Sequence, residues 1–430
     1  MARHAALPGF RDFYPEEMAL RQRIMSVWRE VAIRYGFEEY DGPPLESLDL
    51  YIEKSGPEIV GQLFNFTDKG GREVALRPEM TPSLVRMLGA RIKGMPRPVR
   101  WFSTPQLFRY EKQQRGRLRE HFQLNMDIIG EESVLADADL LAAALDVLRS
   151  LGLTSDDVVA RYSDRRLLHS ALLALGVQEE SLPVAYNVID KVERDPKDVC
   201  MKRLGEIGLS YEQAEEALGL TRMTPDAIGR RFAGDESFGP ILQDLERYRA
   251  ALASLGFADW IQLDMKIVRG LAYYTGIVFE IFDRKGQLRA ICGGGRYDRL
   301  FSSLAGIDVP ALGFGFGDVV LGELLKDRGL AQNDPRGPDV FVIANEDGVD
   351  VLPVVAMLRA AGFSTVYAYR QSEKANVGKA LKAAASARAK VALMVGKLSD
   401  PPGETTVAIK TLATGDQQTV TLSDFLVRRS

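Results

Sequence analysis

The sequence has little of the two side chains that most often carry metal and redox chemistry. Its 430 residues include two cysteines, Cys200 and Cys292, and three histidines, His4, His121 and His169. The cysteines stand far apart and have no further pair nearby, which argues against a disulfide framework or a cysteine zinc site. So few histidines leave little material for a histidine metal site or a Ser–His–Asp arrangement. We therefore expect neither a cysteine nor a histidine metal site, and the sequence assigns no metal ligand among the protein's own side chains.

Other familiar signatures are missing as well. No Walker-type loop occurs, no GxGxxG follows an expected strand, and HExxH is absent. No apolar run approaches the roughly 18 residues of a membrane span, and the amino-terminal segment lacks the apolar centre of a secretory signal. The 55 basic and 59 acidic residues give a net charge of −4, which argues against nucleic-acid binding by bulk positive charge alone. We expect a cytoplasmic globular protein with no membrane partner and with local basic patches.

Length and pattern together predict an α+β protein of several domains. Residues 1–162 alternate helical and strand-like segments, residues 163–254 contain short amphipathic helices, and strand patterns return in residues 255–330. The simplest interpretation is one antiparallel-sheet domain interrupted by a helical insertion. A linker rich in Asp, Pro and Gly spans residues 331–338. Strands and helices alternate again in residues 339–430, which predicts a small α/β domain with a largely parallel sheet.

Residues 107–130, LFRYEKQQRGRLREHFQLNMDIIG, alternate apolar and polar side chains around a basic centre. Period-two alternation predicts a hairpin in which Arg109 and Glu111 share a face with Gln123 and Asp127. The predicted loop between the strands supplies three basic residues, Lys112, Arg115 and Arg117. A solvent-facing hairpin explains this pattern as well as a binding surface does. The stretch alone leaves both interpretations open.

Three further stretches contain candidate site residues. Arg269 lies within an apolar run, KIVRGLAYYTGIVFE, so it needs either a structural carboxylate partner or an anionic ligand. The glycines at 293–295 in ICGGGRYDRL permit either close approach of a ligand or a tight turn with a bulge. In LRPEMTPSLVR, Glu79 and Thr81 stand between a strand and a helix, where Thr81 could bind a ligand or cap the helix before Pro82.

Six successive stretches resemble the class II aminoacyl-tRNA synthetases, and within them the histidyl-tRNA synthetase family: PGFRDFYPEE, YGFEEYDGPPLE, LRPEMTPSLVR, FRYEKQQRGRLREHFQLNMDIIG, VRGLAYYTGIVFE and GGGRYD. The resemblance covers nearly the whole chain and is weakest in the helical insertion. It implies a six- or seven-stranded antiparallel sheet carrying the active site, an insertion that closes on tRNA, and an anticodon-binding α/β domain. A homodimer formed through the segment around Pro43 is also implied. The implied reaction converts L-histidine and ATP, with Mg²⁺, into histidyl-adenylate, and then transfers histidine to the 3′ end of histidine tRNA.

The resemblance also implies roles for individual residues. Catalytic contacts are implied for Arg109, Arg269 and Gln123. The implied histidine site consists of Glu79, Thr81, Arg109, Gln123, Asp127, Arg269, Tyr273 and Tyr274. The implied ATP site consists of Arg109, Glu111, Arg117, Arg119 and Arg269. The guanidinium groups of its four arginines are suited to binding phosphate oxygens at two points. Gln114 and Arg115 are the candidates for contact with the tRNA acceptor end.

Two departures from the family pattern keep other readings open. The third class II motif normally ends in an Arg, but ALGFGFGDVVLGE has Asp318, Val319 and Val320 there. Ala272 replaces an acidic residue that usually precedes the tyrosine pair. The chief alternative is therefore a non-catalytic relative, the regulatory subunit of ATP phosphoribosyltransferase in histidine biosynthesis. A synthetase for proline, threonine or glycine is disfavoured by VRGLAYYTG and GGGRYD, and a purely nucleic-acid-binding module would not need such a polar face.

Overall fold

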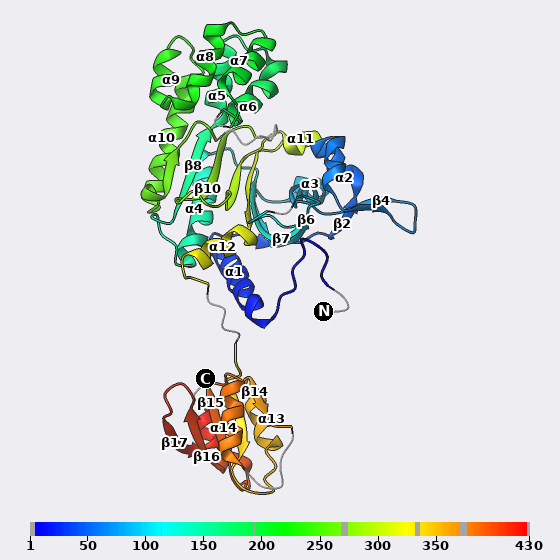
Figure 1. Ribbon diagram of the computed structural model, residues 1–430, viewed down its shortest axis with the longest axis vertical. Helices are drawn as coiled ribbons and strands as arrows, with labels where there is room; N and C mark the ends of the chain where they lie inside the picture. The colour runs from blue at the N-terminus through cyan, green and yellow to red at the C-terminus, as the bar shows by residue number, and fades with distance from the viewer. Residues whose placement is uncertain are drawn as a thin grey trace. The chain divides into compact units, whose positions relative to one another are not determined.

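A computed structural model describes residues 5–112, 114–192, 194–267, 274–331, 336–369 and 376–427. Arg269, Ala272 and Tyr273 lie outside these described residues. The chain forms two compact units, Met1–Gln332 and Asn333–Ser430 (Figure 1).

The larger unit is built on a sheet of nine strands within the described residues. The strand order is β1 (Glu38–Glu39), β5 (Val99–Ser103), β7 (Glu120–Ile129), β12 (Ala311–Gly317), β11 (Cys292–Arg296), β10 (Ile277–Asp283), β8 (Val158–Asp164) and β9 (Ile261–Leu263), and β6 (Gln106–Phe108) also pairs with β7. Six consecutive strands of this order run antiparallel to one another: β5, β7, β12, β11, β10 and β8. At the two edges, β1 pairs parallel with β5 and β9 pairs parallel with β8. The predicted antiparallel sheet is confirmed.

Each face of this sheet has its own helical cover (Figure 1). One face packs against α1 (Pro15–Arg34), α4 (Val134–Ser150), α10 (Phe238–Ser254) and α12 (Asp318–Asp327). Leu124 and Met126 of β7 point into this core, because alternate residues of a strand share a face. The other face packs against α3 (Thr81–Gly89) and α11 (Leu300–Ala305), and Ile129 points that way. Asp127, two residues before Ile129, lies on this second face.

A small antiparallel sheet and one helix flank the second face. The sheet contains β2 (Leu45–Ser47), β4 (Glu73–Leu76) and β3 (Asn65–Thr67) in that order, and the helix is α2 (Leu48–Ser55). Leu48 and Tyr51 of α2 pack with Leu63 and Ala75 in a separate apolar cluster. This arrangement holds Lys54, near the end of α2, close to the main sheet.

The helical segment between β8 and β9 runs through α5 (Arg165–Ala174), α6 (Leu182–Asp190), α7 (Lys197–Glu206), α8 (Tyr211–Gly219), α9 (Pro225–Arg231) and α10. Leu245, Tyr248 and Leu252 of α10 belong to the same buried cluster as Leu124 of the sheet. The helices therefore share one continuous apolar core with the sheet. Their treatment as a separate domain stays a prediction.

The smaller unit has a mixed sheet in the order β14 (Thr365–Tyr367), β13 (Val340–Ala344), β15 (Val391–Val395), β16 (Thr406–Thr411) and β17 (Gln417–Thr421). Its described helices are α13 (Leu352–Ala360), α14 (Val377–Ser386) and α15 (Leu422–Val427). β14, β13 and β15 are parallel, whereas β16 and β17 pair antiparallel. The prediction of a largely parallel sheet is thus wrong for the second half. A short turn joins β16 to β17, so this pair needs no crossover helix.

Candidate active site

A cavity of about 710 Å³ opens on the polar face of the main sheet. The charged and polar side chains in its wall are Arg109, Glu111, Arg117, His121, Gln123, Arg194, Glu280 and Arg289. Gly293 and Gly315 form part of its floor, and Val319 and Val320 close one side. We call this space the basic cavity, because four arginines and two carboxylates line it.

The floor depends on the alternating glycines of β12. A Cβ atom at Gly313 would lie 2.0 Å from Oδ1 of Asp127, and one at Gly315 would lie 2.7 Å from Nε2 of Gln123. Neither position has room for a side chain, so the two polar side chains of β7 lie flat over the neighbouring strand. The intervening Phe314 points into the opposite core. The glycine alternation in residues 311–317 was a signal for this surface that the sequence analysis did not use.

Asp127 is 4% exposed and accepts a hydrogen bond from the hydroxyl of Tyr297. Burial raises the pKa of Asp127 to about 7, although the Tyr297 bond and the charge of Lys54 act in the other direction. A carboxyl with this pKa can gain or lose a proton near neutral pH. Tyr297 belongs to GGGRYD, yet sequence reasoning did not single it out.

Glu79 forms an ion pair with Lys54. Burial would raise the pKa of Glu79, but the positive charges of Lys54 and Arg109 outweigh it and hold the pKa below the usual value. Arg109 itself donates from Nε to the carbonyl oxygen of Pro78 at 3.0 Å. The contacts of Arg109 thus link the basic cavity to the segment that carries Glu79.

Thr81 is the first residue of α3, and Met80 occupies the N-cap position without a side-chain cap bond. The capping alternative for Thr81 is therefore wrong. The reason is that the helix begins one residue earlier than the Thr–Pro pair suggests.

Arg109 and Glu111 lie beyond the end of β6, so the predicted strand is too long. The amide of Arg109 still bonds to the carbonyl of Arg119 at 2.9 Å, but the amide of Glu111 turns back to the carbonyl of Arg109. The turn brings Glu111 to Arg117, with which it forms an ion pair. Strand alternation therefore does not explain why these side chains share the cavity.

Arg119 is not among the side chains that line the basic cavity. Its guanidinium carbon lies 4.1 Å from the ring centre of Tyr110, and Nη1 lies 3.5 Å from the carbonyl oxygen of Pro8. The contact of Arg119 with ATP stays a prediction.

Residues 114–118, which we call the basic loop, lie against α12. Nη2 of Arg115 is 2.9 Å from Asp327, and Nε is 3.5 Å from Glu323. Gln114 accepts a hydrogen bond of 2.7 Å from Nη2 of Arg289. Both candidates for tRNA contact are thus held by protein groups in this structure.

Tyr274 is the described member of the tyrosine pair. It is 6% exposed and lines a smaller cavity beside Thr275, Tyr186 and Arg165. A Cβ atom at Gly295 would lie 3.0 Å from Cδ1 of Tyr274. The carbonyl oxygen of Ile277 on β10 would be closer still, at 2.7 Å, so the third glycine of GGGRYD allows close approach of both β10 and this tyrosine.

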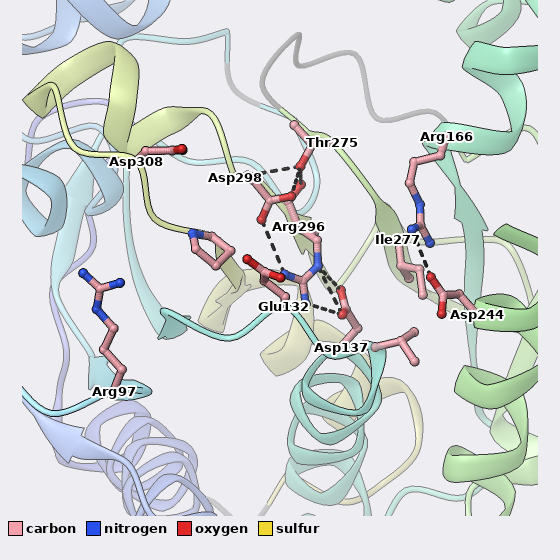
Figure 2. Close-up of a pocket in the computed structure, with 12 residues that line it drawn as sticks. Arg97, Glu132, Asp137, Arg166, Asp244, Thr275, Ile277, Arg296, Asp298 and Asp308 are labelled. Atoms are coloured by element: carbon pink, nitrogen blue, oxygen red, sulfur yellow. Dashed lines mark hydrogen bonds and ion pairs between the residues drawn. The ribbon is translucent and has the colours of Figure 1, made fainter. Parts of the chain in front are cut away.

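Another cavity, of about 410 Å³, is lined by Arg296 and Asp298 and is called the acidic cavity below (Figure 2). Nη2 of Arg296 is 2.5 Å from Oδ2 of Asp137, and Nη1 donates to the carbonyl of Glu131 at 2.8 Å. Asp298 accepts from Oγ1 of Thr275 at 2.8 Å. Arg296 and Asp298 are thus satisfied by protein groups, whereas Tyr297 between them contacts Asp127.

The described residues contain neither a metal-binding cluster nor a membrane-spanning helix. No group of three or more His, Cys, Asp or Glu residues in the described ranges could hold a metal ion. No helix in this part of the chain is long and apolar enough to span a membrane.

The six-stranded antiparallel run, with an arginine-lined cavity on its polar face, defines the catalytic fold of the class II aminoacyl-tRNA synthetases. The family model for histidyl-tRNA synthetase matches residues 9–317. The chain therefore belongs to the histidyl-tRNA synthetase family.

Individual relatives agree over most of the chain. The histidine–tRNA ligase of Opitutus terrae is 43% identical over 92% of this chain and 91% of its own length. The chloroplastic/mitochondrial histidine–tRNA ligase of Arabidopsis thaliana is 42% identical over 97% of this chain and 85% of its own. The crystal structure of histidyl-tRNA synthetase from Nostoc sp. PCC 7120 superposes with a TM-score of 0.82 over the full length of both chains, at 23% identity, and supports the fold.

Proposed function

We propose that this chain is a histidine–tRNA ligase, which activates L-histidine with ATP and transfers it to the 3′ end of histidine tRNA. The observation that carries the proposal is the polar face of β7. Gln123 and Asp127 lie there over a glycine floor, and the basic cavity adjoins them. One surface thus offers polar partners for an amino acid beside positive charge for a nucleotide.

In the first step, a carboxylate oxygen of histidine attacks the α-phosphorus of ATP, the bond from that phosphorus to the bridging oxygen breaks, and pyrophosphate leaves. No side-chain nucleophile takes part, so catalysis depends on positioning and on stabilising charge in the transition state. We assign Arg109 to the α-phosphate and the histidine carboxylate, with Gln123 beside it. Arg269 is assigned to the opposite side of the same phosphate on the family resemblance alone.

For amino-acid recognition, we assign Asp127 to the imidazole ring, enclosed by Tyr273 and Tyr274. A buried carboxylate that accepts a ring N–H disfavours amino acids that leave it unpaired. The α-amino group is assigned to Glu79, Thr81 and Gln123.

ATP would bring Mg²⁺, which neutralises phosphate charge when bound. Mg²⁺ usually takes one or two protein carboxylates together with phosphate oxygens and water. Glu111 and Glu280 are the carboxylates in the wall of the basic cavity and fit this role. Glu111, Arg117 and Arg119 are the other proposed ATP contacts.

The remaining assignments concern partners and compartment. Dimerisation near Pro43 is supported by Leu45 and Phe66, which are 37% and 51% exposed on the neighbouring small sheet. We assign anticodon binding to residues 339–430 and closure on the tRNA to residues 163–254, with Gln114 and Arg115 facing the acceptor end. The cytoplasm is the proposed compartment.

An ATP–pyrophosphate exchange assay with each standard amino acid tests the proposal. We expect exchange with L-histidine and with no other amino acid. Absence of histidine-dependent exchange by purified protein with ATP and Mg²⁺ would exclude the ligase and favour the regulatory-subunit alternative. Exchange with proline, threonine or glycine instead would make the chain another class II synthetase.

A further inference from the structure

The end of β12 offers no cation to ATP, although the family pattern has an Arg there. Asp318 is taken up by protein groups: Oδ2 lies 2.9 Å from Nη1 of Arg11, and Oδ1 accepts from the amide of Phe122 at 2.9 Å. The next two residues, Val319 and Val320, present apolar surface to the basic cavity.

The basic loop occupies the space beside Val320. A Cβ atom at Gly116, where φ is +77°, would lie 3.2 Å from Cγ2 of Val320. A longer side chain at position 320 would meet the loop as it lies here. A cation for this end of the cavity therefore has to come from another element.

Arg289 enters the same cavity from the connection between β10 and β11. This connection is fixed where it leaves β10: Asp283 accepts from the amides of Lys285 and Gln287 at 3.1 and 3.3 Å and pairs with Arg328 at 2.5 Å.

At the other end of the connection, the carbonyl of Ile291 accepts from the amide of Gly317 at 3.3 Å. Gly317 directly precedes Asp318, Val319 and Val320 in the chain. This hydrogen bond holds the segment that carries Arg289 beside residues 318–320, where the family pattern has the third-motif Arg.

The charges of the basic cavity single out two arginines. Arg117 is paired with Glu111, and Arg194 lies 3.9 Å from Asp190. Among the described residues, Arg109 and Arg289 have no carboxylate partner; Arg109 donates to a carbonyl and Arg289 to an amide oxygen.

Burial and the surplus of positive charge in the basic cavity lower the pKa of Arg117. The charges are those of Arg289 and then Arg109. Three guanidinium groups that repel one another in one cavity suit a ligand with several negative charges.

We propose that Arg289 binds the pyrophosphate portion of ATP and supplies the positive charge that the third motif lacks in this chain. This inference rests on the proposed function. Arg109, which contacts Pro78 beside Glu79, lies on the amino-acid side. Arg289 lies two residues before Ile291, whose carbonyl bonds to Gly317 just ahead of Val319 and Val320. When the bond between the α-phosphorus and the bridging oxygen breaks, negative charge builds on the leaving pyrophosphate, and Arg289 stabilises it.

Binding measurements on the full-length chain test Arg289 separately from amino-acid choice. Calorimetry with Mg²⁺ compares ATP with AMP, which lacks the pyrophosphate portion. Arg289→Gln removes the charge but keeps an N–H donor for Gln114. We expect Arg289→Gln to weaken ATP about tenfold to hundredfold and to leave AMP unchanged, because charge-assisted hydrogen bonds are lost with ATP alone. Arg289→Lys, which keeps the charge, should recover part of the affinity for ATP.

Lys285→Ala is the matched control. Lys285 is an exposed cation of the same connection and is not among the residues that line the cavity. Its substitution should leave both affinities unchanged. An equal loss of ATP and AMP affinity in Arg289→Gln would show that Arg289 only supports the basic loop.

Kinetics complete the test. In histidine-dependent exchange, Arg289→Gln should raise KM for ATP and for pyrophosphate about tenfold or more while KM for histidine stays the same. Normal exchange combined with weak tRNA charging would identify Arg289 as a tRNA contact and overturn the proposal. If Arg289→Gln weakens ATP binding while the wild-type protein shows exchange with no amino acid, the proposed function is refuted and the ATP contact of Arg289 stands.

Discussion

The basic and acidic cavities use the same residue type in opposite ways. In the acidic cavity, Arg296 is only 8% exposed and is paired with Asp137 (Figure 2). It also donates to the main-chain carbonyls of Glu131 and Ser133. In the basic cavity, Arg109 and Arg289 keep donors that no described carboxylate takes. The contacts of Arg296 are complete without a ligand, whereas those of Arg109 and Arg289 are not. The comparison is therefore between one paired arginine and two arginines without a carboxylate partner among the described residues.

The largest expected effect concerns the stability of the acidic cavity. Arg296→Met leaves Asp137 buried without its cation, which should lower the free energy of unfolding by about 3–5 kcal/mol. Chemical denaturation measures this change. Arg296→Met combined with Asp137→Leu should recover most of the loss, since no charge is then left unpaired. If the single variant unfolds at the wild-type denaturant concentration, the structural role of Arg296 is wrong.

The corresponding substitution in the basic cavity should spare stability and remove activity. Arg109→Met should lower the rate of histidine-dependent exchange about 10²–10³-fold, the usual loss when one charge-stabilising donor is removed. The same denaturation experiment should place its free energy of unfolding within about 1 kcal/mol of wild type. A variant that loses activity only in proportion to unfolded protein would contradict this contrast.

The third prediction concerns how the stability contributed by Asp127 depends on pH. Its pKa is raised from 3.8 to about 7 in the folded chain, so the folded state holds a proton that the unfolded state releases between pH 4 and pH 7. Stability from this group is present below pH 4 and is lost as pH rises to about 7. Asp127→Asn cannot ionise, so it should be more stable than wild type at pH 8 by about 2–4 kcal/mol, and by less at pH 5. Urea denaturation at both pH values measures this, and an equal difference at the two values would exclude Asp127 as the cause.

The smallest effect is expected where the basic loop meets α12. Arg115 is 55% exposed in its pairs with Glu323 and Asp327, and exposed ion pairs contribute at most about 1 kcal/mol. Arg115→Ala should therefore change neither thermal stability nor exchange measurably. If Arg115 leaves α12 to contact tRNA, the rate of tRNA charging should fall. Unchanged charging would assign Arg115 to the protein alone.

The parts of the site that follow a regular period were predictable. Alternation along β7 correctly separates Leu124 and Met126 from Asp127. The alternating pattern continues past Phe108 in the sequence, but the chain turns there, so the positions of Arg109 and Glu111 could not follow from periodicity.

Contacts that join distant parts of the chain were not predictable either. The partners of Arg115 on α12 lie more than 200 residues further along the sequence. Arg289 lies in an irregular connection whose sequence, DRKGQLRA, resembles an ordinary solvated turn. Its place in the wall of the same cavity as Val319 and Val320 follows from the fold and from no motif.

The glycine alternation of β12 restricts how this strand can change over evolutionary time. At Gly313 and Gly315 even a methyl group would displace Asp127 or Gln123, whereas Phe314 faces a core that accepts other apolar residues of similar volume. The strand thus has one face on which any side chain must move a polar group of the site and another on which substitution is gradual. A randomised library of residues 311–317, selected for growth, should return glycine at positions 313 and 315 and a mixture of apolar residues at position 314.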